Sequence, residues 1–155
     1  MRLEPYRWRL SPSWLAHLYK AVVRQHHTEL IPILRPLLAP DAVIFDVGAH
    51  AGQFAKLFAK LAPAGRVWSF EPGSYARSIL RLSLCLNRID NVTVVPMGLG
   101  ESCAIGTLTL PIKRRGSFGF GLAHLGQTEE RWRRVAAEPI ALGTIDRFVE
   151  TQGIT

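Results

Sequence analysis

The chain has 155 residues, of which 48% are hydrophobic and 20% charged, a balance that suits one globular domain and excludes a disordered segment. Its formal net charge of +7 attracts nucleic acid, anionic lipid or acidic metabolites without selecting among them. Two cysteines, Cys85 and Cys103, make neither a disulfide framework nor a metal site, so we expect buried or half-buried free thiols.

Residues 1–40 are expected to form a helical extension that precedes the main domain, residues 41–155. The apolar residues of a helix over 13–24 recur at helical spacing: Trp14, Leu15, Leu18 and Val22. Ser13 is the expected N-cap of that helix. A second short helix, over 29–38, is interrupted by prolines. Because aromatic and basic residues mix in this extension, a membrane-surface helix is an alternative interpretation.

The sequence has no segment that predicts export or a membrane span. No apolar run approaches the roughly 20 residues that cross a bilayer. Residues 1–10 alternate arginine with tryptophan and tyrosine and contain no long apolar stretch, so they do not resemble a signal peptide. We therefore expect a cytoplasmic protein.

Strand and helix patterns alternate between residues 43 and 95. Short apolar runs predict buried strands at 43–45, 67–70 and 92–95. Helical spacing predicts a helix from about 51 to 63 and another over 74–88. The second helix is expected to bury one face: Tyr75, Ile79, Leu82 and Leu86. This β-α-β-α-β pattern predicts a Rossmann-like α/β fold, with parallel strands in the order 3-2-1 and helices on both faces.

The pattern changes after Pro96. Strands are expected at 107–110 and 139–142, a loop at 113–121, and a short helix over 144–150 that Thr144 caps. The chain stops at Thr155, where an α/β domain would begin another strand, so we expect a domain truncated before its fourth strand. Such a domain leaves one edge of its first strand unpaired, which favours self-association.

The residues that indicate chemistry lie between the first strand and the first helix. They read Asp46-Val47-Gly48-Ala49-His50-Ala51-Gly52. Open α/β sheets bind ligands at this place, beyond the carboxyl ends of their strands. Gly48 lets the backbone turn tightly and approach a ligand, and Gly52 allows close packing of the helix. Glu71 ends the second strand, where a carboxylate accepts hydrogen bonds from the two hydroxyls of a ribose.

These features predict an adenosine-type cofactor, and the spacing favours S-adenosylmethionine. Dinucleotide sites prefer G-x-G-x-x-G, whose middle glycine admits the pyrophosphate, and His50 stands where that glycine is missing. S-adenosylmethionine has no phosphate and carries an ammonium and a sulfonium. The acid at Asp46 suits these positive groups and would repel a pyrophosphate. A dinucleotide and a structural accident are the alternatives.

Several ordered motifs resemble those of the FkbM-type methyltransferases, over roughly residues 40 to 155. They are 43–52, Phe70-Glu71-Pro72, Leu86-Asn87, 91–95, Met97-Gly98-Leu99-Gly100 and 139–146. The resemblance implies a class I methyltransferase fold and transfer of a methyl group from S-adenosylmethionine to an oxygen of a small molecule or glycan. The implied cofactor-binding residues are Asp46, Gly48, Ala49, His50, Gly52, Glu71, Pro72, Met97 and Gly98.

The resemblance has two departures. The family's Ile-Lys-Ile-Asp-Val-Glu-Gly-like strand, near the transferred methyl group, is absent from this chain. The loop at Met97 and Gly98 also has no acid to bind the adenine amino group. We therefore name no catalytic residue, and an inactive fragment or binding module is a rival reading.

Other polar residues have two readings each. The net charge of +7 makes an RNA methyltransferase a further alternative. A basic group could bind an acidic acceptor or be a solvated face: Lys113, Arg114, Arg115, Arg131, Arg133 and Arg134. His50 could contact the cofactor or an acceptor hydroxyl, or be a solvated loop residue. His26 and His27 lack further metal ligands, so we expect no metal site.

Overall fold

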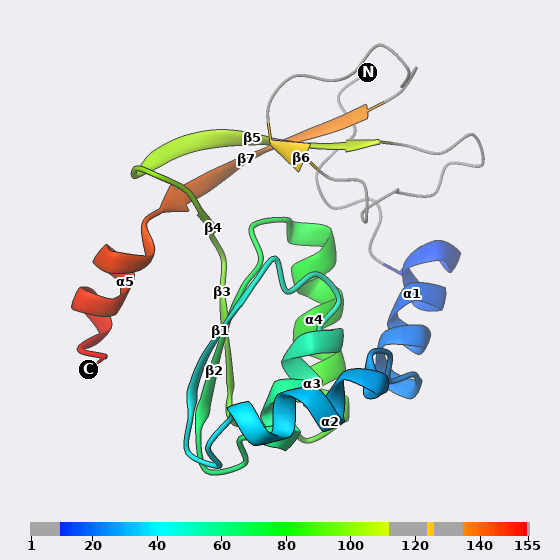
Figure 1. Ribbon diagram of the computed structural model, residues 1–155. Helices are drawn as coiled ribbons and strands as arrows, with labels where there is room; N and C mark the ends of the chain where they lie inside the picture. The colour runs from blue at the N-terminus through cyan, green and yellow to red at the C-terminus, as the bar shows by residue number, and fades with distance from the viewer. Residues whose placement is uncertain (1–9, 112–123, 126–134, 155) are drawn as a thin grey trace.

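Three parallel strands form the sheet that carries the predicted site (Figure 1). They are β1 (Val43–Val47), β2 (Arg66–Phe70) and β3 (Val92–Val95). A computed structural model describes residues 10–111, 124–125 and 135–154 of the chain. The strands are paired in the order β1-β2-β3, which confirms the predicted order 3-2-1 of a Rossmann-like α/β fold. The register sets Val47 beside Phe70, so the two strands end together at the site.

The sheet is covered by helices on both faces, as predicted (Figure 1). Successive side chains of a strand point to opposite faces. Ile44 and Val67 therefore pack on one side, against Phe58 of α3 (Gln53–Leu61). The helix α4 (Ser74–Leu86) packs on the sheet beside α3. Trp68 and Phe70 pack on the other side, against α5 (Ile145–Gln152). The ring of Phe148 in α5 meets Phe70 edge-on, with 4.8 Å between the ring centroids.

The buried face of α4 differs from the predicted one. Tyr75 and Ile79 are buried as expected, but Leu82 is 40% exposed and Leu86 is 60% exposed. The helix instead turns a second row inward, and its buried members are Ala76, Leu80, Ser83 and Leu84. The reason is that α4 packs between the sheet and a further helix, so its buried surface is wider than one stripe of leucines.

That further helix is α1 (Pro12–Val23), which lies beside α4 (Figure 1). Its N-cap is Ser11, whose Oγ accepts from the Trp14 N–H at 3.3 Å, so the predicted cap, Ser13, was wrong. Its last carbonyls accept from α3 and α4. Lys56 Nζ donates to Ala21 O and to Arg24 O, at 2.9 Å for Arg24, and Ser83 Oγ also donates to Ala21 O. The helix is therefore fastened to both of its neighbours.

Three short helical segments join α1 to the sheet. They are η1 (Thr28–Leu30), α2 (Ile31–Leu34) and η2 (Arg35–Leu37), where one interrupted helix was predicted. Before them, His27 adopts a left-handed φ of 64° and stacks on Phe54, with 4.6 Å between the ring centroids. Among the described residues, no group of histidine, cysteine and acidic side chains could hold a metal ion.

A second sheet follows the first along the chain. Its strands are β4 (Gly98–Leu99), β5 (Ala104–Pro111), β6 (His124–Leu125) and β7 (Val135–Gly143), in the order β4-β7-β5-β6. The strands predicted at 107–110 and 139–142 lie within β5 and β7, which are longer. Thr144 caps α5 as predicted, because its Oγ1 accepts from the Arg147 N–H at 3.2 Å.

The two cysteines lie on the surface of the protein. Cys85 and Cys103 are free, as expected, but both are exposed, which corrects the expectation of buried or half-buried thiols. Cys85 follows the buried row of α4 in sequence. Within the part of the chain that the structure describes, no helix combines the length and the apolar character that a bilayer crossing requires.

One edge of β1 has no paired strand among the described residues. Within the described residues β1 pairs with β2 alone, and Val43 and Val47 are exposed. Because unpaired strand edges accept further strands, we expect the 155-residue chain to self-associate in sedimentation velocity. Val47→Lys should shift it toward monomer, whereas Val23→Lys, an equally exposed site on α1, should not. A monomer at every concentration, or equal effects of the two substitutions, would contradict this.

Candidate cofactor site

The turn between β1 and α3 is built from residues with left-handed backbone angles. Gly48 has φ 77°, His50 has φ 55° and Gly52 has φ 86°. The N–H groups of Gly48 and Ala49 both donate to Phe70 O, at 2.9 and 3.0 Å. The end of β2 therefore holds the first half of the turn, and the glycines supply a backbone path that other residues adopt at a cost.

The side chain of Glu71 holds the second half of the turn. Its Oε2 accepts from the His50 N–H at 2.8 Å, and its Oε1 accepts from the Gly73 N–H at 2.8 Å. The residue is only 7% exposed. Burial raises the pKa of Glu71, and the two N–H bonds oppose that rise without cancelling it. Each carboxylate oxygen can accept more than one hydrogen bond.

Asp46 supplies a second buried carboxylate next to the turn. It is 6% exposed, and its Oδ2 accepts from Ser69 Oγ at 3.2 Å. Burial raises the pKa of Asp46 to about 6, and the serine bond lowers it by less. A carboxylate in this position gains stability from a nearby cation, because a positive charge favours its ionised form. The start of the turn therefore suits a positively charged group.

The two glycines of the turn have different surroundings. No atom lies within 4 Å of the position that a Cβ on Gly48 would take. A Cβ on Gly52 would lie 2.4 Å from Leu80 Cδ1. The space beside Gly48 is therefore open, whereas Gly52 allows the turn to pack on α4. The packing role of Gly52 was predicted from the sequence, and a ligand beside Gly48 stays a prediction.

The remaining predicted residues lie where β2 and β3 end. Pro72 and Gly98 are close, since Pro72 Cγ lies 3.7 Å from the position of a Cβ on Gly98. The Met97 side chain packs with Trp68, Phe70 and Val95, on the face that α5 covers. The structure thus brings Glu71 onto the turn and Pro72 beside Gly98. Met97, in contrast, contributes its side chain to the core.

Two charged residues that the sequence did not point to support this region. Arg77 Nη1 donates to Glu71 O at 3.0 Å and to Pro72 O at 2.6 Å. Glu138 in β7 accepts from the Ser74 N–H and from Ser74 Oγ, both at 3.0 Å. Arg77 lowers the pKa of Glu71 and Glu138 raises it. The sequence carried no signal for Glu138, which lies 64 residues from Ser74.

Several predicted features lie outside the described residues. They are the loop at 113–121 and its basic group Lys113, Arg114 and Arg115, together with Arg131, Arg133 and Arg134. Tyr6 and Trp8, the aromatic residues near the N-terminus, also lie outside the described residues.

Comparisons with known proteins cover parts of this chain. No family model matches it. The AMB antimetabolite synthetase AmbE of Pseudomonas aeruginosa is 42% identical over 67 residues, which are 43% of this chain and 3% of that protein. The chain therefore spans a very small part of this curated relative.

Three solved structures are similar to part of the chain. The methyltransferase FkbM of Methylobacillus flagellatus is 15% identical, with a TM-score of 0.47, over 88% of this chain and 37% of that one. A presumed rRNA methylase of Clostridium thermocellum is 23% identical, with a TM-score of 0.41, over 49% and 44%. TYW2 of P. horikoshii, solved with MeSAdo, is 20% identical, with a TM-score of 0.35, over 57% and 28%. With TM-scores below 0.5, these likenesses decide no function.

The contrast between the two glycines leads to a stability prediction. Gly48→Ala adds only the cost of a left-handed alanine, about 1–2 kcal/mol. Gly52→Ala adds the same cost and also displaces the buried Leu80, so its free energy of unfolding should fall by about 1 kcal/mol more. Urea unfolding of the two variants measures the difference. Equal losses would show that Leu80 does not restrict the turn.

Proposed function

We propose that this chain binds S-adenosylmethionine at the glycine turn and is part of a methyltransferase. The observation that supports the proposal most directly is the position of Glu71, whose carboxylate lies on the turn and holds the His50 N–H. A strand-end carboxylate beside a glycine turn is suited to the two hydroxyls of a ribose. The open space beside Gly48 supports the approach of a ligand to the turn.

The charges at the turn favour a cation over a pyrophosphate. Asp46 and Glu71 are both buried carboxylates with raised pKa values. A pyrophosphate beside them would add negative charge to two groups that burial already disfavours in their ionised form. A sulfonium and an ammonium would instead stabilise them. The residue at the place of the missing pyrophosphate glycine is His50, whose backbone N–H is already bonded to Glu71.

The chemistry that the cofactor supplies when bound is an electrophilic methyl group, which an acceptor displaces in line. The residues of this chain would bind and orient the cofactor, which contributes proximity. We propose an oxygen of a small molecule or glycan as the acceptor, on the resemblance to the FkbM-type sequences. The net charge of +7 favours RNA as the second candidate acceptor. We assign no general base, and a binding module is the rival function.

A conservative substitution tests the role of Glu71. Glu71→Gln keeps the shape but replaces one acceptor oxygen with a donor, so S-adenosylmethionine should bind more weakly by about 1–3 kcal/mol. Isothermal titration calorimetry measures the affinity. Glu150→Gln, which removes an exposed carboxylate in α5, is the matched control and should change nothing.

A stability measurement separates the two roles of Glu71. The substitution also weakens the hydrogen bond to the His50 N–H, so the unfolding midpoint is measured on the same samples. A fall in stability with unchanged affinity would exclude Glu71 from contact with the cofactor. Weaker binding by a variant that is still folded at the assay temperature would support the contact.

A further inference from the structure

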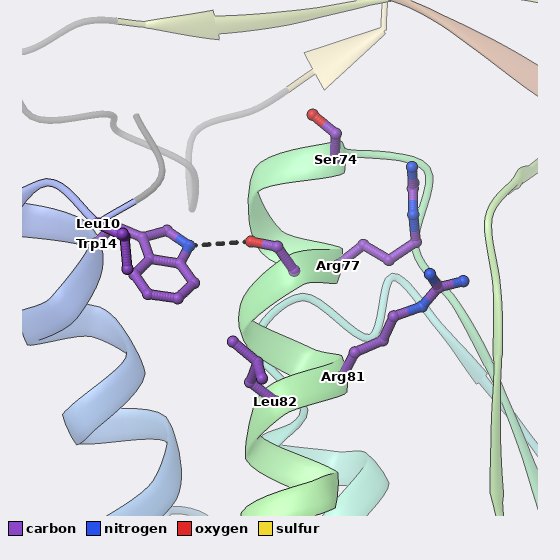
Figure 2. Close-up of a pocket in the computed structure, with 7 residues that line it drawn as sticks. Leu10, Trp14, Ser74, Arg77, Arg81 and Leu82 are labelled. Atoms are coloured by element: carbon purple, nitrogen blue, oxygen red, sulfur yellow. Dashed lines mark hydrogen bonds between the residues drawn. The ribbon is translucent and has the colours of Figure 1, made fainter. Parts of the chain in front are cut away.

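A hollow lies between α1 and α4 (Figure 2). Its volume is about 530 Å³, which is within the range of small-molecule sites. Its lining residues are Leu10, Trp14, Ser74, Arg77, Ser78, Arg81 and Leu82. Five of these follow the i, i+4, i+8 rows of α4, so one stripe of that helix forms the floor.

The hollow has an apolar side and a cationic side. Figure 2 shows Leu10 and Trp14 on one side of α4, while the side chains of Arg77 and Arg81 extend from the other side. Trp14 is fixed in place, since its Nε1 donates to Ser78 Oγ at 2.9 Å. Leu82 belongs to the lining although 40% of it is exposed, and its exposure corrects the sequence-based expectation that it is core. A leucine so placed offers apolar surface to a ligand.

The two arginines differ in the hydrogen bonds that they make. Arg77 donates to the carbonyls of Glu71 and Pro72, so it serves the neighbouring turn. Arg81 is exposed, and among the described residues its guanidinium makes no hydrogen bond or ion pair. A guanidinium binds carboxylate, sulfonate or phosphate through paired N–H groups. Arg81 is therefore the group in this hollow that is available for an anion.

We propose that the hollow between α1 and α4 is a binding site for a small ligand that joins an anionic group to an apolar body. Arg81 binds the anionic group, and the exposed side chains of Leu10 and Leu82 contact the apolar body. Trp14 is 4% exposed and supports this side of the hollow. The site is separate from the glycine turn, and its occupation does not require the methyl-donor function. It borders that turn through Trp14, which packs in one cluster with Ala51.

Two fluorescent probes test the site on the full chain. Anilinonaphthalene sulfonate carries the anionic group and the apolar body, and phenylnaphthylamine is its uncharged counterpart. Arg81→Gln should lower the affinity for the sulfonate probe by about fivefold, the scale of one partly exposed charge-assisted contact. The same substitution should change the affinity for the uncharged probe by less than about twofold. Arg81→Lys should restore most of the sulfonate affinity, because it keeps the charge.

Two further variants complete the design. Leu82→Gln removes apolar surface at a half-exposed position, where folding tolerates it, and should weaken both probes by about threefold. Lys20→Gln removes one exposed positive charge from α1 outside the hollow and should affect neither probe. If Arg81→Gln and Leu82→Gln both behave like Lys20→Gln, the probes bind elsewhere and the site is excluded. If Leu82→Gln alone weakens binding, the hollow is apolar only and the anionic part of the proposal is wrong.

Discussion

The hydrogen bond from the His50 N–H to Glu71 Oε2 is the contact on which the candidate site depends. It joins the turn after β1 to the end of β2, 21 residues further along the chain. The turn needs that contact because three of its residues have left-handed backbone angles, which a polar partner must hold in place. The same carboxylate is the group that we propose to bind the ribose, so holding the turn and binding the ligand would be coupled.

Three sets of interactions keep Glu71 in position. The parallel register of β1 and β2 brings their carboxyl ends level. Arg77 holds the backbone of Glu71 and Pro72 from the first turns of α4. Glu138 satisfies the N-terminus of α4 from the second sheet, where a negative charge is favoured by the helix dipole. The second sheet therefore supports the site, because one of its strands binds the N-terminus of the helix that follows Glu71.

The sequence predicted the elements whose signals are local. Val92–Val95 has the bounds that were expected, because a continuous apolar run between turn residues is a strong signal for a buried strand. Thr144 was identified as a cap because its position relative to α5 is local. The turn and Glu71 were placed together because parallel strands end on the same edge of a sheet. Leu82 was misplaced because periodicity does not tell which of two adjacent helix faces meets the core.

Contacts between distant segments carried no such signal. Lys56 has a buried side chain in α3 because the last carbonyls of α1 accept from it, and burial lowers its pKa. A lysine in an amphipathic helix normally predicts a solvated position. Glu138 and Arg77 were missed for the same reason, since their partners are set by the packing of separate elements. The hollow at Trp14 and Arg81 exists only once α1 lies on α4.

The pH dependence of ligand binding to the intact chain tests the central claim most directly. Calorimetry would compare S-adenosylmethionine with NAD between pH 5 and 8, across the value of about 6 to which burial raises the pKa of Asp46. A cation favours the ionised carboxylate, so affinity for S-adenosylmethionine should rise as pH rises through about 6, and Asp46→Asn should remove that rise. NAD should bind more weakly throughout. Tighter binding of NAD, or no binding of S-adenosylmethionine at any pH, would contradict the account.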